Sequence, residues 1–83
     1  MKIDETRLAL NNIVARQIRE ARERKGWTYY KLAQASGVNV GHVHRLEEGF
    51  LTPRIDTLNA LCRALEIKIV FPIDTQNGKK SRF

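Results

Sequence analysis

The sequence predicts an all-α fold of four to five helices, followed by one short strand. Apolar residues recur at helical spacing in four separate stretches. Glycines and capping residues stand at the ends of these stretches. The strand is predicted because the apolar spacing changes from helical to alternating after Glu66. With 83 residues, the chain has room for one compact core and not for a second folded domain.

The first and the fourth predicted helices are the longer ones. The first begins between residues 4 and 12 and ends at Gly26, which supplies a left-handed cap. Its inward residues are Leu10, Val14, Ile18 and Ala21. The fourth helix begins at Ile55, just after Pro53, and its inward residues are Ile55, Leu58, Leu61, Cys62 and Leu65. Trp27 and Cys62 are expected to be part of the core.

Two short helices lie between them, separated by a tight turn. Thr28 is expected to cap the first of these helices and Asn39 the second. Gly37 and Gly49 end them. The residues expected to pack the two helices together are Leu32, Ala33, Val38, Val43 and Leu46.

After the helices, Ile67, Ile69 and Phe71 alternate with Lys68 and Val70. This alternation predicts a strand at residues 67–73, after a helical domain at residues 1–66 and before a flexible basic tail at residues 74–83. A single strand needs a partner strand for its backbone, and this chain offers none. We therefore expect the strand to pair with its copy in a second chain and to form a homodimer.

Charge and cysteine usage limit the function. Lys and Arg number 15 against 9 Asp and Glu, giving a net charge of +6, which favours an anionic partner such as nucleic acid. Cys62 is the one cysteine, so neither an intrachain disulfide nor a multi-cysteine zinc site is possible. No long apolar run or signal-peptide pattern is present, so we expect a cytoplasmic protein that does not enter a membrane.

The stretch GWTYYKLAQASGVNVGHVHRLEEGFLTPRIDTLNALCRAL resembles the helix-turn-helix domain of the Cro/C1 repressor family. The resemblance covers roughly residues 16–66. It implies a salt bridge between Arg22 on the first helix and Glu47 at the end of the third, the recognition helix. One position departs from the family pattern: Tyr29 stands where many members carry a glutamine immediately after the cap of the second helix.

The resemblance also implies which residues contact duplex DNA. Base contacts are expected from the recognition helix, at Val40, Gly41, His42, His44 and Arg45. Phosphate contacts are expected at Thr28, Tyr29, Asn39, Thr52 and Arg54. Among these residues Arg45 is the strongest candidate, because arginine can donate two hydrogen bonds to guanine.

The two histidines also raise the alternatives of a metal site and of catalysis. His42 and His44 are two residues apart, so a helix places them on different sides, and no third ligand cluster is visible in the chain. Catalysis would need a nucleophile or acid and a pocket, for which four small helices leave little room. We therefore expect no enzyme activity, no metal and no cofactor.

The function predicted from the sequence is a transcriptional repressor that binds a palindromic operator as a homodimer. The C-terminal strand also resembles that of the antitoxin repressors of Hip kinase modules, which implies a kinase-type toxin as a partner. An ordinary repressor without a toxin is the alternative within gene regulation. A protein-binding adaptor on the same scaffold is the alternative outside it, although the basic charge and the placement of Arg45 and Arg54 favour DNA.

Overall fold

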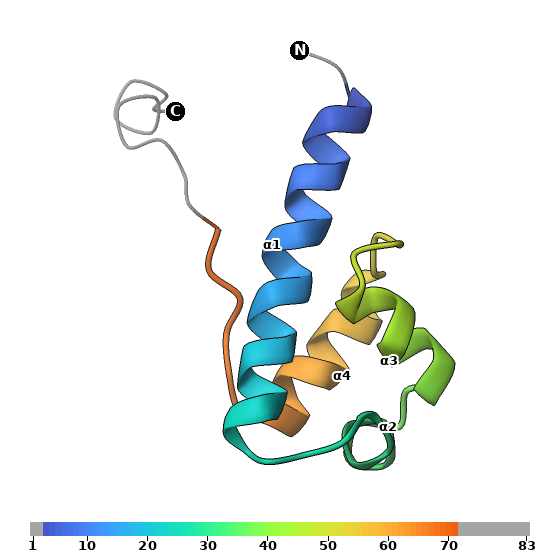
Figure 1. Cartoon of the computed structure of the whole chain (residues 1–83), viewed down its shortest axis with the longest axis vertical. Coiled ribbons are helices and arrows are strands. Elements are labelled where there is room, and N and C mark those ends of the chain that lie inside the picture. Colours follow the sequence, from blue (N-terminus) through green and yellow to red (C-terminus); the bar gives the residue numbers. More distant parts are fainter. Residues whose placement is uncertain (1–2, 72–83) are drawn as a thin grey trace.

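The computed structural model describes residues 3–71 and contains four helices there. These are α1 (Ile3–Arg24), α2 (Tyr29–Ser36), α3 (Val40–Glu47) and α4 (Ile55–Leu65). The helix α1 runs along the whole length of the domain, and the three shorter helices gather against its C-terminal half (Figure 1). Contacts between α2 and α3, and from both α1 and α2 to α4, close the domain into one body.

The helix ends confirm the capping predictions. The hydroxyl oxygen of Thr28 accepts a hydrogen bond from the backbone N–H of Lys31, at 3.1 Å. The side-chain oxygen of Asn39 accepts from the N–H groups of Gly41 and His42, at 2.8 and 3.2 Å. Gly37 closes α2 in the left-handed conformation, with φ of 81°. The turn between α2 and α3 is therefore specified by its own residues.

The core is apolar and draws on all four helices. Its fully buried members are Val14, Ile18, Ala21, Leu32, Val43, Leu46, Leu61 and Leu65. Trp27 and Cys62 pack against this cluster while staying partly exposed, and burial raises the pKa of the Cys62 thiol. Two expected core residues lie outside the core, because Leu10 is 43% exposed and Ile55 is 82% exposed. Residues 7–10 are all exposed, and Ile55 belongs to the first turn of α4, so in the part of the chain that the structure describes neither position is covered by another helix.

The strand expected at residues 67–73 is not formed in the part of it that the structure describes. Residues 67–71 form no strand and run alongside α1 as an irregular extended segment (Figure 1). Ile67 and Ile69 pack against the core as the alternation predicted, but Phe71 is 40% exposed. Among residues 3–71 this segment has no neighbouring backbone to pair with. Residues 72–73 and the predicted tail, 74–83, lie outside the described residues.

The side chain of Gln17 takes the place of a strand partner. Its amide nitrogen donates to the carbonyl oxygen of Val70 at 2.5 Å, and its oxygen accepts from the Val70 N–H at 2.8 Å. One carboxamide on α1 therefore satisfies both backbone groups of Val70. The extended segment stays on α1 through these two bonds and through the packing of Ile67 and Ile69.

Candidate nucleic-acid interface

The helix α3 has one buried face and one exposed face. Val43, Leu46 and Glu47 are buried, at 0%, 1% and 3% exposure. His44 and Arg45 are exposed, and Gly41 lies on the same side one turn earlier. Hydrophobic packing therefore fixes the inner face, while the outer face is open to a partner.

Arg45 is the most available charged side chain on this outer face. It is exposed, and its guanidinium has no hydrogen bond or ion pair with any residue in the range 3–71. An unpaired guanidinium keeps all five of its N–H donors for a partner. Nothing within the described chain therefore competes with a base or a phosphate for Arg45.

The first turn of α3 is tightly built. Val40, Gly41 and His42 are each partly buried, and the cap from Asn39 covers the start of the helix. A β-carbon added at Gly41 would lie 3.1 Å from the side-chain oxygen of Asn39, closer than ordinary contact. The glycine therefore leaves room for the cap, and it also removes side-chain bulk from the outer face.

Arginines from α1 hold the C-terminal end of α3. The Nε and Nη2 atoms of Arg22 lie 2.7 and 3.1 Å from the two carboxylate oxygens of Glu47, and Nη1 donates to the Trp27 carbonyl at 2.7 Å. The structure thus brings together the two residues for which the resemblance implied a salt bridge. Hydrogen bonding to the Glu47 carboxylate is the main reason that the pKa of Arg22 is raised. Such a bidentate, largely buried pair fixes both the distance and the orientation of the helix that carries Glu47.

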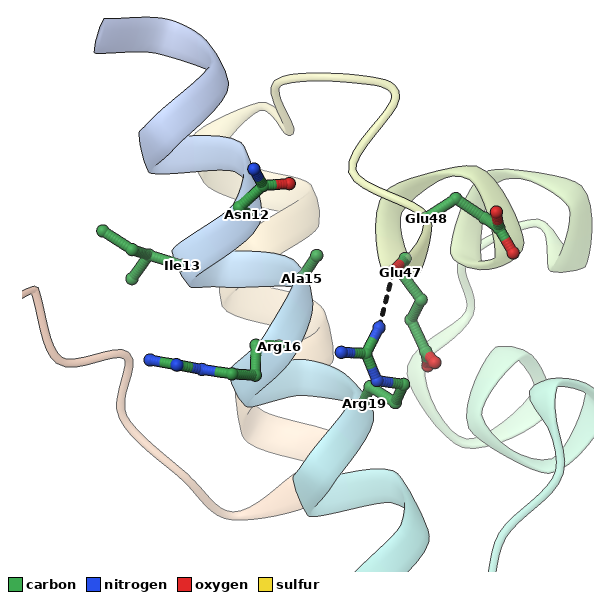
Figure 2. A pocket seen from close by; sticks show the side chains of 7 residues that line it. All are labelled: Asn12, Ile13, Ala15, Arg16, Arg19, Glu47 and Glu48. Carbon is green, nitrogen blue, oxygen red and sulfur yellow. Dashed lines mark hydrogen bonds between the residues drawn. The ribbon is translucent and has the colours of Figure 1, made fainter.

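A second arginine reaches the same helix end from the preceding turn of α1. Arg19 donates to the backbone carbonyl of Glu47 at 3.1 Å, as Figure 2 shows. This carbonyl belongs to the last turn of α3, where helical carbonyls lack intrahelical donors. The positive charge of Arg19 also complements the negative end of the helix dipole. The role of Arg19 was not predicted from the sequence. Its position one turn before Arg22 on α1 is the pattern that could have indicated it.

The ring of Tyr29 lies where three helices meet. The guanidinium carbon of Arg22 on α1 is 4.5 Å from the centre of the ring, and the imidazole of His44 on α3 packs edge-on at 4.9 Å, with an interplanar angle of 89°. Nε2 of His44 is in turn 3.6 Å from a carboxylate oxygen of Glu48. The Tyr29 ring therefore contacts both Arg22, which belongs to the buried salt bridge, and His44, which lies on the outer face of α3.

The residues expected at phosphates divide into two groups. Thr28 and Asn39 accept backbone hydrogen bonds with their oxygens, which leaves the Thr28 hydroxyl proton and the Asn39 amide protons free to donate to a phosphate. Thr52 instead donates its hydroxyl proton to Asn11 at 2.9 Å, so a phosphate would have to displace that bond. Thr52 connects the loop before α4 to α1, which sequence spacing did not reveal.

Arg54 is exposed and forms an ion pair with Asp56, with Nε and Oδ1 3.2 Å apart. The pKa of Asp56 is lowered, first by the backbone N–H of Thr57 and then by Arg54. Because the pair is open to solvent, its mutual attraction is weak and salt screens it. A phosphate can therefore replace Asp56 as the partner of Arg54.

Lys31 is a further cation that was not predicted from the sequence. Its Nζ lies 5.6 Å from the centre of the Trp27 ring, and it has no anionic partner among residues 3–71. It follows the Thr28 cap by three residues, so it lies in the first turn of α2, where unpaired N–H groups already favour an anion. The position of Lys31 after the cap is the sequence signal that points to it.

Two other kinds of site have no support in the described range. Residues 3–71 contain no group of three or more His, Cys, Asp or Glu side chains arranged to hold a metal ion. In the same range, no helix combines the length and the apolar character needed to cross a membrane.

Two short helices joined by a tight turn, with a buried inner face and an open outer face on the second, define a helix-turn-helix protein. Comparison with known families agrees: residues 13–68 match the helix-turn-helix domain, and the chain belongs to this family. Comparisons with curated proteins and with solved structures give no match. Membership in the family indicates a DNA-binding regulator, a class of domain that is typically not enzymatic.

Proposed function

We propose that the protein is a sequence-specific transcriptional repressor of the Cro/C1 type, which binds a palindromic operator as a homodimer. The observation that carries the proposal is the outer face of α3, where Arg45 has no partner within the described chain. The net charge of +6 supports a polyanionic ligand. The buried junction of Arg22 and Glu47 supports a helix that is held in one orientation, as base recognition requires.

In this proposal Arg45 donates to a guanine in the major groove, and Val40 contacts a thymine methyl group. Gly41 lets the backbone of α3 approach the bases closely, and His42 and His44 border the contact. Thr28, Asn39 and Lys31 donate to phosphates around the start of α2 and α3, and Arg54 does so from the loop before α4. The base contacts thus come from α3, and the phosphate contacts come from the starts of α2 and α3 and from the loop before α4.

The test compares two arginine substitutions on a duplex selected by the wild-type protein from a random-sequence pool. Arg45→Ala should weaken binding by about 1–3 kcal/mol and relax the preference at one base pair. Arg54→Ala should weaken binding to selected and random duplexes alike. The slope of log affinity against log salt concentration should fall by about one, the value expected for the loss of one phosphate contact. Full affinity and unchanged base preference in Arg45→Ala would remove its base-reading role. A wild-type protein that binds no duplex even at low salt would favour the adaptor alternative.

The homodimer part of the proposal is supported by one open backbone edge. The N–H and C=O groups of Val70 are bound to Gln17, but those of Ile69 have no hydrogen-bond partner among residues 3–71. In an extended chain the backbone groups of neighbouring residues point to opposite sides. The side that carries Ile69 is therefore free to pair with the same segment of a second chain, which would make a two-stranded ribbon. Such a dimer can place two copies of α3 in successive major grooves, about 34 Å apart.

Two substitutions at Ile69 separate backbone pairing from side-chain packing. Ile69→Ala removes the packing against the core but keeps the N–H, whereas Ile69→Pro removes both. If the dimer depends on the Ile69 edge, sedimentation equilibrium should show Ile69→Pro to be much more monomeric than Ile69→Ala. Equal dimerisation of the two variants would place the interface elsewhere.

The resemblance to antitoxin repressors adds a partner to the proposal. A gene for a kinase-type toxin should lie beside the gene for this protein, and the two purified proteins should form a complex on size-exclusion chromatography. An unrelated neighbouring gene would leave the ordinary repressor as the function.

A further inference from the structure

We propose that Tyr29 is a positioning residue, whose ring fixes the imidazole of His44 on the outer face of α3. The inference rests on the proposed function, because it concerns the same recognition surface. It gives Tyr29 a different role from the phosphate contact that the resemblance implies.

The ring of Tyr29 has a rigid support. All three nitrogens of the Arg22 guanidinium donate to fixed acceptors, two of them to Glu47 and one to the Trp27 carbonyl. The guanidinium therefore cannot turn away from the face of Tyr29, whose centre lies 4.5 Å from it. A desolvated cation against an aromatic face is an attractive contact in its own right. Arg22 thus fixes Tyr29 as well as Glu47.

Tyr29 in turn restrains His44. The two rings meet at 89° with their centres 4.9 Å apart, the edge-to-face arrangement that aromatic pairs prefer. Glu48 is a second neighbour, with its carboxylate 3.6 Å from Nε2 of His44. The His44 side chain is 52% exposed, and without these neighbours it would sample several rotamers. A restrained imidazole loses less conformational entropy when a ligand binds to it.

The ring and the hydroxyl group of Tyr29 can be tested separately. The contacts with Arg22 and His44 use the ring, and the hydroxyl of Tyr29 has no hydrogen bond with any residue in the described range. Phenylalanine keeps the ring and lacks the hydroxyl, whereas leucine lacks both. Tyr30, the next residue, is 75% exposed and is therefore the matched control for a leucine substitution on the same helix.

The first experiment needs no DNA. The chain has two histidines, so the imidazole C–H resonances of His44 can be assigned by NMR with His42 as the internal reference. A ring at this distance displaces the His44 resonances through its ring current. The displacement should persist in Tyr29→Phe and Tyr30→Leu and disappear in Tyr29→Leu, while His42 stays unchanged. Unaltered His44 resonances in Tyr29→Leu would overturn the proposal.

The second experiment measures binding to a duplex selected by the wild-type protein and to a random-sequence duplex of the same length. Tyr29→Phe and Tyr30→Leu should stay within about twofold of wild type on both, because the aromatic contacts remain. Tyr29→Leu should lose about tenfold on the selected duplex and much less on the random one. Its base preference should weaken next to the position read by Arg45. Thermal unfolding followed by circular dichroism establishes that the variants are folded at the assay temperature.

The opposite result is equally specific. If Tyr29→Phe loses as much affinity as Tyr29→Leu on both duplexes, and the slope of log affinity against log salt concentration falls by about one, the hydroxyl accounts for the whole effect and the positioning role is wrong. Failure of the proposed function is distinguishable, because the wild-type protein itself would then bind neither duplex while the NMR result still stood.

Discussion

The helix α1 holds two segments of the chain by polar side chains, and it does so in different ways. At the end of α3, Arg22 forms a bidentate pair with Glu47, whose side chain is 2% exposed. Beside residues 67–71, the neutral carboxamide of Gln17 binds the backbone of Val70 at the surface. Charge-assisted bonds in a buried site are strong and directional, whereas water can readily replace neutral bonds at the surface. The domain therefore holds α3 firmly against α1, whereas it holds the extended segment by bonds that water can replace.

The largest effect should come from breaking the contact between Arg22 and Glu47. Glu47→Ala leaves Arg22 without its carboxylate, and the free energy of unfolding should fall by about 3–5 kcal/mol. The neighbouring variant Glu48→Ala is the control, because that carboxylate is exposed and its loss should change stability by less than about 1 kcal/mol. Urea unfolding measures both. Equal losses in the two variants would show that the buried pair does not differ from a surface pair.

A smaller effect is expected from the close approach of the turn after α3 to α1. Gly49 has φ of 82°, and a β-carbon there would lie 2.7 Å from the side-chain oxygen of Asn12. Gly26 has φ of 70°, and a β-carbon there would meet nothing within 4 Å, so Gly26→Ala isolates the backbone cost, about 1–2 kcal/mol. The contact is with the far end of the exposed Asn12 side chain, which can turn aside, so Gly49→Ala should cost at most about 0.5–1 kcal/mol more than Gly26→Ala, and adding Asn12→Ala should remove that excess. Thermal unfolding of the wild type and these variants measures the difference; identical losses in Gly49→Ala and Gly26→Ala would contradict it.

Breaking the contact between Gln17 and Val70 should cost little stability. Gln17→Ala removes both hydrogen bonds to Val70, and stability should fall by about 0.5–1 kcal/mol, because water can replace exposed neutral bonds. The Val70 amide should exchange with solvent much faster, whereas the Ile67 amide, bound to the Cys62 carbonyl at 3.0 Å, should not. Hydrogen exchange followed by NMR distinguishes them. A Val70 amide that exchanges at the wild-type rate would mean that Gln17 does not hold the segment.

The smallest effect should be a gain in stability at the hinge between α4 and the extended segment. Glu66 has φ of 61° and is the one non-glycine residue with positive φ in the described range. Glu66→Gly relieves that conformation but loses the exposed ion pair with Lys25, so we expect a net gain of about 0.5 kcal/mol. This corresponds to a rise of about 2–4 °C in Tm. Lys25→Ala measures the ion pair alone, and a lower Tm in Glu66→Gly would show that the pair outweighs the backbone.

Local signals in the sequence predicted the fold well. The caps at Thr28 and Asn39 and the helix stop at Gly37 depend on residues within four positions of one another, so the sequence alone specifies them. The core positions of the central helices follow from helical periodicity for the same reason. The pairing of Arg22 with Glu47 joins residues far apart in the chain, and it came from the resemblance to a known family.

The features that the sequence did not predict depend on contacts between residues far apart in the chain, or on what covers the end of a helix or pairs with a strand. Thr52 donates to Asn11, 41 positions away, which no local pattern indicates. Ile55 fits the apolar spacing of α4, but at the first turn of that helix no other helix covers it. Alternation at residues 67–71 correctly predicted that Ile67 and Ile69 pack against the core. It did not indicate whether a second strand is present, which a strand requires for its backbone hydrogen bonds.

The division of α3 into an anchored and an open face also bears on how such a domain can change its target. Substitutions at Arg45 alter the open face without touching the core or the contacts of α1, so under the proposed function new base preferences could arise there with little loss of stability. His44 differs, because it packs on Tyr29. A new side chain at His44 would call for a compensating one at Tyr29, so a library for redesigning specificity should vary those two positions together and Arg45 independently.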